Sequence, residues 1–198
     1  MPANKRGWKI NFDELYQDEP DEAARSRLEE FVIPSPDDAF AAAIYAVSES
    51  KFKTEASMAL HLGKFALFAD KTAPSLILDP KGLTVCGRRN AARWASPTLV
   101  YTVEYCTADN GSLLGLPIVL IDVEERAFSY LPLESSLPYR LTLRDAHVQI
   151  VEDYKDPRIP SPERDTFSIE QLMWIDTAKL GAGGERYLQA RKAFGMPS

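Results

Sequence analysis

Apolar and polar residues follow strand-like patterns through most of the middle of the chain. The segment Leu99–Cys106 alternates apolar and polar side chains, which is typical of a strand with one buried face. The segment Leu116–Leu133 holds two apolar runs separated by the charged stretch Asp122–Arg126. Two such runs around a short polar turn predict an antiparallel hairpin.

Further segments extend this β region in both directions. Ala39–Ser48 is rich in alanine, but a Pro-Asp turn precedes it and both of its faces are apolar, so we expect a strand buried on both sides. Other strands are expected at Leu60–Ala69, Pro74–Leu78 and Leu83–Cys86. In Pro138–Tyr154 the apolar parity shifts by one residue at Arg144-Asp145. That shift indicates a tight turn between two strands or a β-bulge.

Helical patterns are confined to the two ends of the chain, and the first ten residues show no regular pattern. Helices are predicted at Asn11–Glu14, Asp21–Glu30, Ser168–Leu180 and Glu185–Phe194. The third of these begins at a capping box formed by Ser168 and Gln171. We therefore predict an α+β fold, mainly β, in which antiparallel sheets carry an N-terminal helix and two C-terminal helices.

The expected organisation is one structural domain in three parts. Residues 1–33 form an acidic helical arm, residues 34–154 an antiparallel β core, and residues 155–198 a Pro-rich linker with a helical tail packed on the core. A chain of 198 residues with 45% hydrophobic residues suits one domain with a buried core. Fourteen prolines against ten glycines favour short elements and firm turns.

The net charge of −6 disfavours nucleic acid or an anionic membrane as the main partner. The acidic residues gather near the N-terminus: Asp13, Glu14, Asp18, Glu19, Asp21 and Glu22. This stretch is either a solvated arm or a surface for a basic protein partner. Two cysteines do not make a disulfide framework, and the N-terminus lacks the apolar core of a signal peptide. We therefore expect a cytoplasmic protein.

Two stretches of the β region share the same order of motifs. One begins at Ser35-Pro36-Asp37 and the other at Ser96-Pro97, and each continues into an apolar strand. Each then reaches a hairpin whose first strand ends at an aspartate, Asp70 or Asp122. On these motifs, residues 33–133 resemble two blades of TolB-like and WD-repeat β-propellers. The resemblance implies a binding scaffold of blade-like sheets without catalytic residues, and two units are too few for a closed propeller.

Few residues suggest catalysis. The sequence has no Gly-rich phosphate loop, no nucleophile elbow and no zinc-binding spacing, so no cofactor or metal is expected. The remaining catalytic candidates are Cys86 or Cys106 acting with His147. A basic loop with Arg88, Arg89 and Arg93 is either solvated or binds an acidic group.

Three functions follow from these observations. The first is a non-catalytic protein-binding module, of which one concrete form is an immunity-type protein that neutralises a bacterial toxin. Its candidate contact residues are Asp18, Glu19, Asp21, Glu22, Arg88, Arg89 and Arg93. The second is a hydrolase that depends on cysteine and histidine. The third is a homo-oligomeric structural protein in which exposed strand edges pair between copies.

Overall fold

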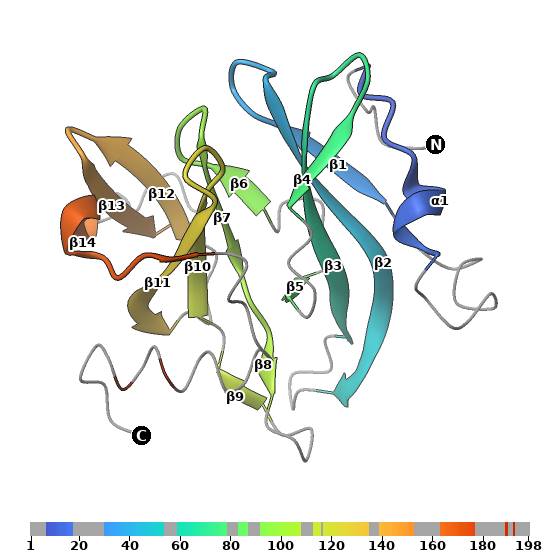
Figure 1. Ribbon diagram of the computed structural model, residues 1–198. Helices are drawn as coiled ribbons and strands as arrows, with labels where there is room; N and C mark the ends of the chain where they lie inside the picture. The colour runs from blue at the N-terminus through green and yellow to red at the C-terminus, as the bar shows by residue number, and fades with distance from the viewer. Residues whose placement is uncertain are drawn as a thin grey trace, which may run out of the picture.

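The fold is built almost entirely from antiparallel β-sheets (Figure 1). The computed structural model describes residues 7–17, 30–53, 59–78, 83–86, 92–107, 113–115, 117–134, 139–152, 163–176, 189 and 192. The prediction of a mainly β fold with antiparallel sheets is confirmed. Within the described residues, no helix is both long and apolar enough to cross a membrane.

Three sheets contain most of the described strands. The first sheet has the order β1 (Phe31–Pro34), β2 (Phe40–Lys53), β3 (Ala59–Ala69) and β4 (Ser75–Leu78), and β5 (Thr84–Cys86) also pairs with β3. The second sheet has the order β15 (Ile175–Asp176), β11 (Ala127–Glu134), β10 (Pro117–Asp122), β7 (Leu99–Val103) and β6 (Ala92–Trp94). The third sheet consists of β12 (Tyr139–Arg144), β13 (His147–Glu152) and β14 (Glu163–Ser168), and β8 (Cys106–Thr107) pairs with β9 (Leu113–Gly115).

The first and second sheets share a strand order. In each, a short strand (β1 or β6) is followed by a turn at a serine and by a neighbouring strand (β2 or β7). The next neighbour follows after residues 54–58 in the first sheet (β3) and after β8 and β9 in the second sheet (β10), and a turn at an aspartate leads to the fourth strand (β4 or β11). The predicted hairpin across Leu116–Leu133 is confirmed as β10 and β11.

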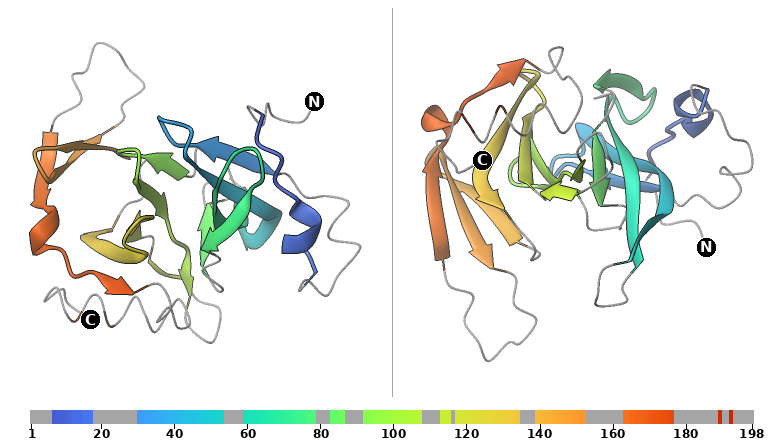
Figure 2. Two further views of the ribbon diagram at one scale, coloured as in Figure 1. Left: turned by 45° about the horizontal axis from the view of Figure 1, so that its top comes forward. Right: turned by 90° about the horizontal axis from the view of Figure 1, so that it is seen from below.

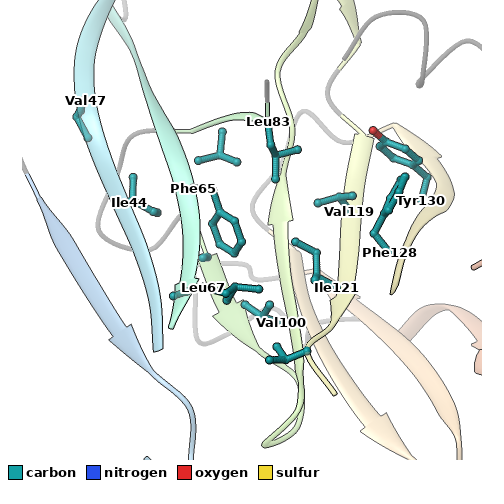
Figure 3. Packing of buried hydrophobic residues seen from close by; sticks show 14 residues of the cluster. Ile44, Val47, Phe65, Leu67, Leu83, Val100, Val119, Ile121, Phe128 and Tyr130 are labelled. Atoms are coloured by element: carbon teal, nitrogen blue, oxygen red, sulfur yellow. The ribbon is translucent and has the colours of Figure 1, made fainter. Parts of the chain in front are cut away.

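The sheets stack face to face, and Figure 2 (right) shows the third, second and first sheets in succession. The first cluster of buried side chains lies between the first and second sheets and includes Phe65, Val100 and Val119 (Figure 3). The second cluster joins the other face of the second sheet to the third sheet, through Leu120 and Val148 among others. Both faces of the second sheet are therefore covered by other sheets.

The outer face of the first sheet is covered by the N-terminal segment Gly7–Gln17, which we call the strap. Four of its side chains are buried: Trp8, Ile10, Phe12 and Tyr16. They pack on the outer face of β2 and β3 and form the third cluster. As expected, residues 7–10 form no helix or strand, but Trp8 and Ile10 are buried on that face, so this part of the chain is packed on the sheet.

The strap contains α1 (Phe12–Leu15), which is the one α-helix among the elements that the described residues define. The predicted cap is present in part: the Asn11 side chain accepts from the Asp13 N–H and donates to Glu14 Oε1. The helix predicted at Asp21–Glu30 lies outside the described residues apart from Glu30.

Strand β2 confirms the prediction made for the alanine-rich segment. Ala42 and Ile44 point into the first cluster, and Ala41, Ala43 and Tyr45 point into the third. All five are at most 3% exposed, so both faces of the strand are buried. Small side chains suit this position because β2 is packed between the second sheet and the strap.

The helix predicted at Ser168–Leu180 is wrong over the residues that the structure describes. Ser168 ends β14, Ile169–Gln171 form one turn of 3₁₀ helix, and Ile175–Asp176 form β15. Ser168 makes no side-chain cap hydrogen bond. Pairing of β15 with β11 outweighs the local helical preference. The helix predicted at Glu185–Phe194 lies outside the described residues, apart from Gln189 and Lys192.

The parity shift at Arg144-Asp145 is a tight turn between β12 and β13. Asp145 and Ala146 have φ values of 48° and 58°, and Arg144 pairs with His147 across the turn. Positive φ at both central residues is the geometry of a type I′ hairpin turn. The shift therefore marks two strands and a turn, not a bulge in one strand.

Candidate functional site

Four turns of the first and second sheets lie at one end of the stack, and we call them the turn rim (Figure 1). They comprise residues 35–39, 70–74, 95–98 and 122–126. The register places them together within each sheet, since Phe40 pairs with Ala69 and Leu99 pairs with Asp122. Between the sheets, Trp94 Nε1 donates to the Ile33 carbonyl at 2.9 Å.

Two of these turns are held by serine hydroxyls. Ser35 Oγ accepts from the Phe40 N–H at 3.1 Å and donates to Asp37 Oδ1 at 2.6 Å. In the corresponding turn of the second sheet, Ser96 Oγ accepts from the Leu99 N–H at 3.0 Å. Side chains of this kind satisfy backbone groups in turns. The Ser-Pro motifs therefore have the same local role in both sheets.

The other two turns are held by aspartates. Asp70 Oδ1 accepts from the Thr72 N–H at 3.1 Å and from the Thr72 hydroxyl at 2.8 Å. Asp122 Oδ1 accepts from the N–H groups of Glu124 and Glu125, both at 3.1 Å. These are Asx turns, in which a carboxylate replaces a backbone acceptor. The aspartates that end the two strands are thus turn-forming residues.

The turn rim carries an excess of negative charge. Its carboxylates are Asp37, Asp38, Asp70, Asp122, Glu124 and Glu125, and its cations are Lys71 and Arg126. The hydrogen bond from the Ser35 hydroxyl holds the pKa of Asp37 below its usual 3.8, and the Thr72 hydroxyl does the same for Asp70. Both side chains are exposed. These two rim carboxylates therefore lose their charge at a lower pH than a free aspartate.

One rim carboxylate connects the rim to the strap. Asp38 accepts from Trp8 Nε1 at 2.9 Å and pairs with Lys71. Trp8 is 2% exposed, whereas the side chains of Lys71 and Asp38 are 36% and 40% exposed. The contact joins the buried strap to two turns of the first sheet.

The structure does not bring the described catalytic candidates together. Cys106 is fully buried on β8, whereas His147 is exposed at the start of β13 in the third sheet. One ring nitrogen of His147, Nδ1, lies 2.7 Å from the Asp145 carbonyl. Cys86 is on β5 of the first sheet, and its side chain lies outside the described residues. The cysteine–histidine pair gains no geometric support from the described side chains.

Most of the predicted partner-binding residues lie outside the described residues: Asp18, Glu19, Asp21, Glu22, Arg88 and Arg89. Arg93 is on β6, half-buried, and pairs in register with Tyr101. The sequence does not mark the rim carboxylates as one surface, because they come from turns that are distant along the chain. The Ser-Pro-Asp turn and the two strand-ending aspartates contain the signal, but as motifs they indicate turns of the fold and not a charged surface.

Hydrogen bonds of buried tyrosine hydroxyls join parts of the fold. Tyr130 donates to Glu104, and both side chains are buried between the first and second sheets. The Tyr101 hydroxyl accepts from the Leu141 N–H at 3.0 Å and links the second sheet to the third. Burial raises the pKa of Tyr105 above 10.0. Within the part of the chain that the structure describes, no group of three His, Cys, Asp or Glu side chains is placed to hold a metal ion.

Comparison of this chain with protein-family models, with curated proteins and with solved structures found no match. The resemblance to propeller blades therefore stays a prediction, and function is inferred from the residues themselves.

Proposed function

We propose that this protein is a non-catalytic protein-binding module whose turn rim contacts a basic surface of a protein partner. The observation that supports the proposal is the gathering of six carboxylates and two cations in four turns at one end of the stack. Turns held on a rigid sheet scaffold are common binding elements in proteins. Complementary charge would steer a basic partner to this end.

Side-chain hydrogen bonds close the turns of the rim. Asp37, Asp70 and Asp122 each use a carboxylate oxygen to close a turn. A surface fixed in this way loses little conformational entropy on binding. Nucleic acid is disfavoured as the partner because phosphates would be repelled by the rim.

The proposal includes two finer statements. The two stretches in residues 33–133 are repeated blade-like units, which is supported by the shared strand order and by the matching serine and aspartate turns. The partner is a bacterial toxin with a basic surface, and the protein acts as its immunity-type inhibitor in the cytoplasm. A small acidic chain with an ordered acidic end suits that role.

The test uses paired charge-removing variants of the full chain and affinity capture from the native cell extract with mass spectrometry. Glu124→Gln/Glu125→Gln removes two exposed rim charges, and Asp13→Asn/Glu14→Gln removes two exposed charges from the strap. A basic partner that the wild type captures should be lost with the rim variant and retained with the strap variant. Equal capture by both variants would contradict the rim as the contact surface.

The pH dependence of partner binding gives a second measurement. Turn hydrogen bonds lower the pKa of Asp37 and Asp70 below 3.8, so these two side chains lose their charge at a lower pH than an ordinary aspartate. Binding that depends on them should persist at about pH 4, where an ordinary glutamate is largely protonated. Titration calorimetry across this range measures it, and loss of binding near pH 6 would instead indicate histidine.

The hydrolase and edge-pairing alternatives are tested separately. A cysteine-dependent hydrolase requires a thiol that alkylating agents reach, whereas burial of Cys106 predicts that its alkylation is slow in the folded protein. Pairing of strand edges between copies predicts dimers in light scattering that do not depend on rim charge.

A further inference from the structure

The turn rim and the strap meet at the side chain of Asp38. One carboxylate oxygen, Oδ1, accepts from Trp8 Nε1 at 2.9 Å, and the other, Oδ2, pairs with the Lys71 ammonium. Lys71 also lies against the first residue of the strap, because a Cβ atom added to Gly7 would be 3.2 Å from Lys71 Cε. Two rim turns and the strap, which are distant along the chain, are therefore joined through this one carboxylate.

The two sheets join their rim turns by different kinds of contact. In the second sheet, the Val123 N–H donates to the Thr98 carbonyl at 2.9 Å, and this backbone hydrogen bond involves no charged group. In the first sheet, the corresponding turns are joined by the ion pair of Lys71 and Asp38, whose side chains are 36% and 40% exposed. Partly exposed ion pairs are weak and respond to other charges nearby. The joint in the first sheet is therefore the one that a charged ligand can alter.

The start of the strap depends on Asp38 as a hydrogen-bond acceptor. Trp8 is 2% exposed, so its indole N–H has little access to water, and a buried donor that loses its acceptor is costly. The other end of the strap is held differently, since the Tyr16 hydroxyl accepts from the Ala46 N–H at 3.1 Å. A change in the pairing of Asp38 should therefore loosen the start of the strap and leave its end in place.

We propose that Asp38 couples the turn rim to the strap, so that a cationic group that binds Asp38 in competition with Lys71 loosens the Trp8 end of the strap. The inference rests on the proposed function, because a basic partner surface supplies such a group. It adds a means of regulation to that site. Occupation of the rim is felt on the outer face of the first sheet and, because such coupling is reciprocal, a tighter strap weakens binding at the rim.

A hexalysine peptide added to the full chain tests the coupling. Titration calorimetry measures binding of the peptide, and Glu124→Gln/Glu125→Gln should weaken it because these charges lie on the rim. Hydrogen exchange is then measured with and without saturating peptide. Exchange in residues 8–12 should become faster by about tenfold, the effect of losing one hydrogen bond. Exchange in β10 and β11 should stay unchanged.

Two matched variants locate the link. Asp38→Asn and Asp122→Asn each remove one rim charge, and each keeps a side-chain oxygen that accepts hydrogen bonds. Asparagine also tolerates the φ of 65° at position 38. In Asp38→Asn the amide oxygen still accepts from Trp8 but no longer attracts a cation, so the peptide should leave strap exchange unchanged. In Asp122→Asn the peptide should accelerate strap exchange as it does in the wild type.

The outcomes separate failure of the coupling from failure of the proposed function. Peptide that binds the rim without changing strap exchange would overturn the coupling and leave the rim as a binding surface. An equal response of the strap in Asp38→Asn and Asp122→Asn would overturn Asp38 as the link. Absence of peptide binding to the wild type would overturn the coupling together with the charge-based attraction on which the proposed function depends.

Discussion

The first and second sheets have the same strand order, but their faces are covered by different kinds of structure. The second sheet lies between two other sheets, and its side chains contribute to both the first and second clusters. The first sheet has a sheet on one side and the strap on the other. A sheet covers its neighbour with many aliphatic contacts, whereas the short strap relies on a few large side chains and hydrogen bonds at its ends. Damage to the strap should therefore be local, and damage between the sheets should be global.

The largest expected effect comes from the packing between the first and second sheets. Phe65 is 1% exposed in the first cluster, and Phe65→Ala should lower the free energy of unfolding by about 3–5 kcal/mol. Urea denaturation followed by far-UV circular dichroism measures the change. An unchanged midpoint would contradict the view that the two sheets stabilise each other.

A hydroxyl removed from the same region should have the next largest effect. Tyr130→Phe deletes a donor to Glu104, whose side chain is fully buried. Weakening the hydrogen bonding of a buried carboxyl should cost about 1–3 kcal/mol of stability. The same denaturation experiment applies. A variant as stable as the wild type would show that other groups satisfy Glu104.

The matched change in the strap tests whether its loss is local. Tyr16→Phe also removes one hydroxyl, in this case an acceptor for the Ala46 N–H, and should cost about 1 kcal/mol. Hydrogen exchange should increase in residues 7–17 and on β2 near Ala46, and stay unchanged in the second sheet. Faster exchange in β10 and β11 would show that strap and stack are not separable.

The smallest expected effect is a gain of stability in the third sheet, outside both regions compared above. Ala146 has a φ of 58°, a conformation that glycine adopts without strain. Ala146→Gly should therefore raise the free energy of unfolding by about 0.5–1 kcal/mol. Ala146→Val is the control and should lower it, because a β-branched side chain is disfavoured at positive φ.

The strands were predictable where the side-chain pattern and the tertiary surroundings agree. Leu99–Cys106 alternates apolar and polar side chains, and β7 forms over Leu99–Val103, although side chains on both faces of that strand are buried. Ala39–Ser48 forms a strand as predicted, although alanine favours helices. Both faces of this segment are apolar, and each face packs into a different cluster of buried side chains. The hairpin of β10 and β11 followed from its charged turn.

The strap and the C-terminal segment were less predictable for opposite reasons. Trp8, Ile10 and Phe12 alternate with Lys9 and Asn11, which is a period-2 signal, but this short run does not show which surface the apolar side chains cover. The spacing of Ile169, Leu172 and Ile175 fits a helix as well as it fits extended chain. Pairing of Ile175 with Phe128 favours the extended chain. The turn rim could not be located because its carboxylates come from turns distant in sequence.

The three tryptophans lie in different layers of the molecule, so their indole N–H signals report on each layer separately. Trp8 donates its indole N–H to Asp38 under the strap, Trp94 donates to Ile33 between the first and second sheets, and Trp174 donates to Ile169 beside the second cluster. Each indole proton therefore lies in a different contact: between the strap and the first sheet, between the first and second sheets, and within the segment Ile169–Trp174. In nitrogen-15-labelled protein, the three indole resonances of one correlation spectrum would distinguish loosening of one layer from loosening of another, without a substitution or an attached probe.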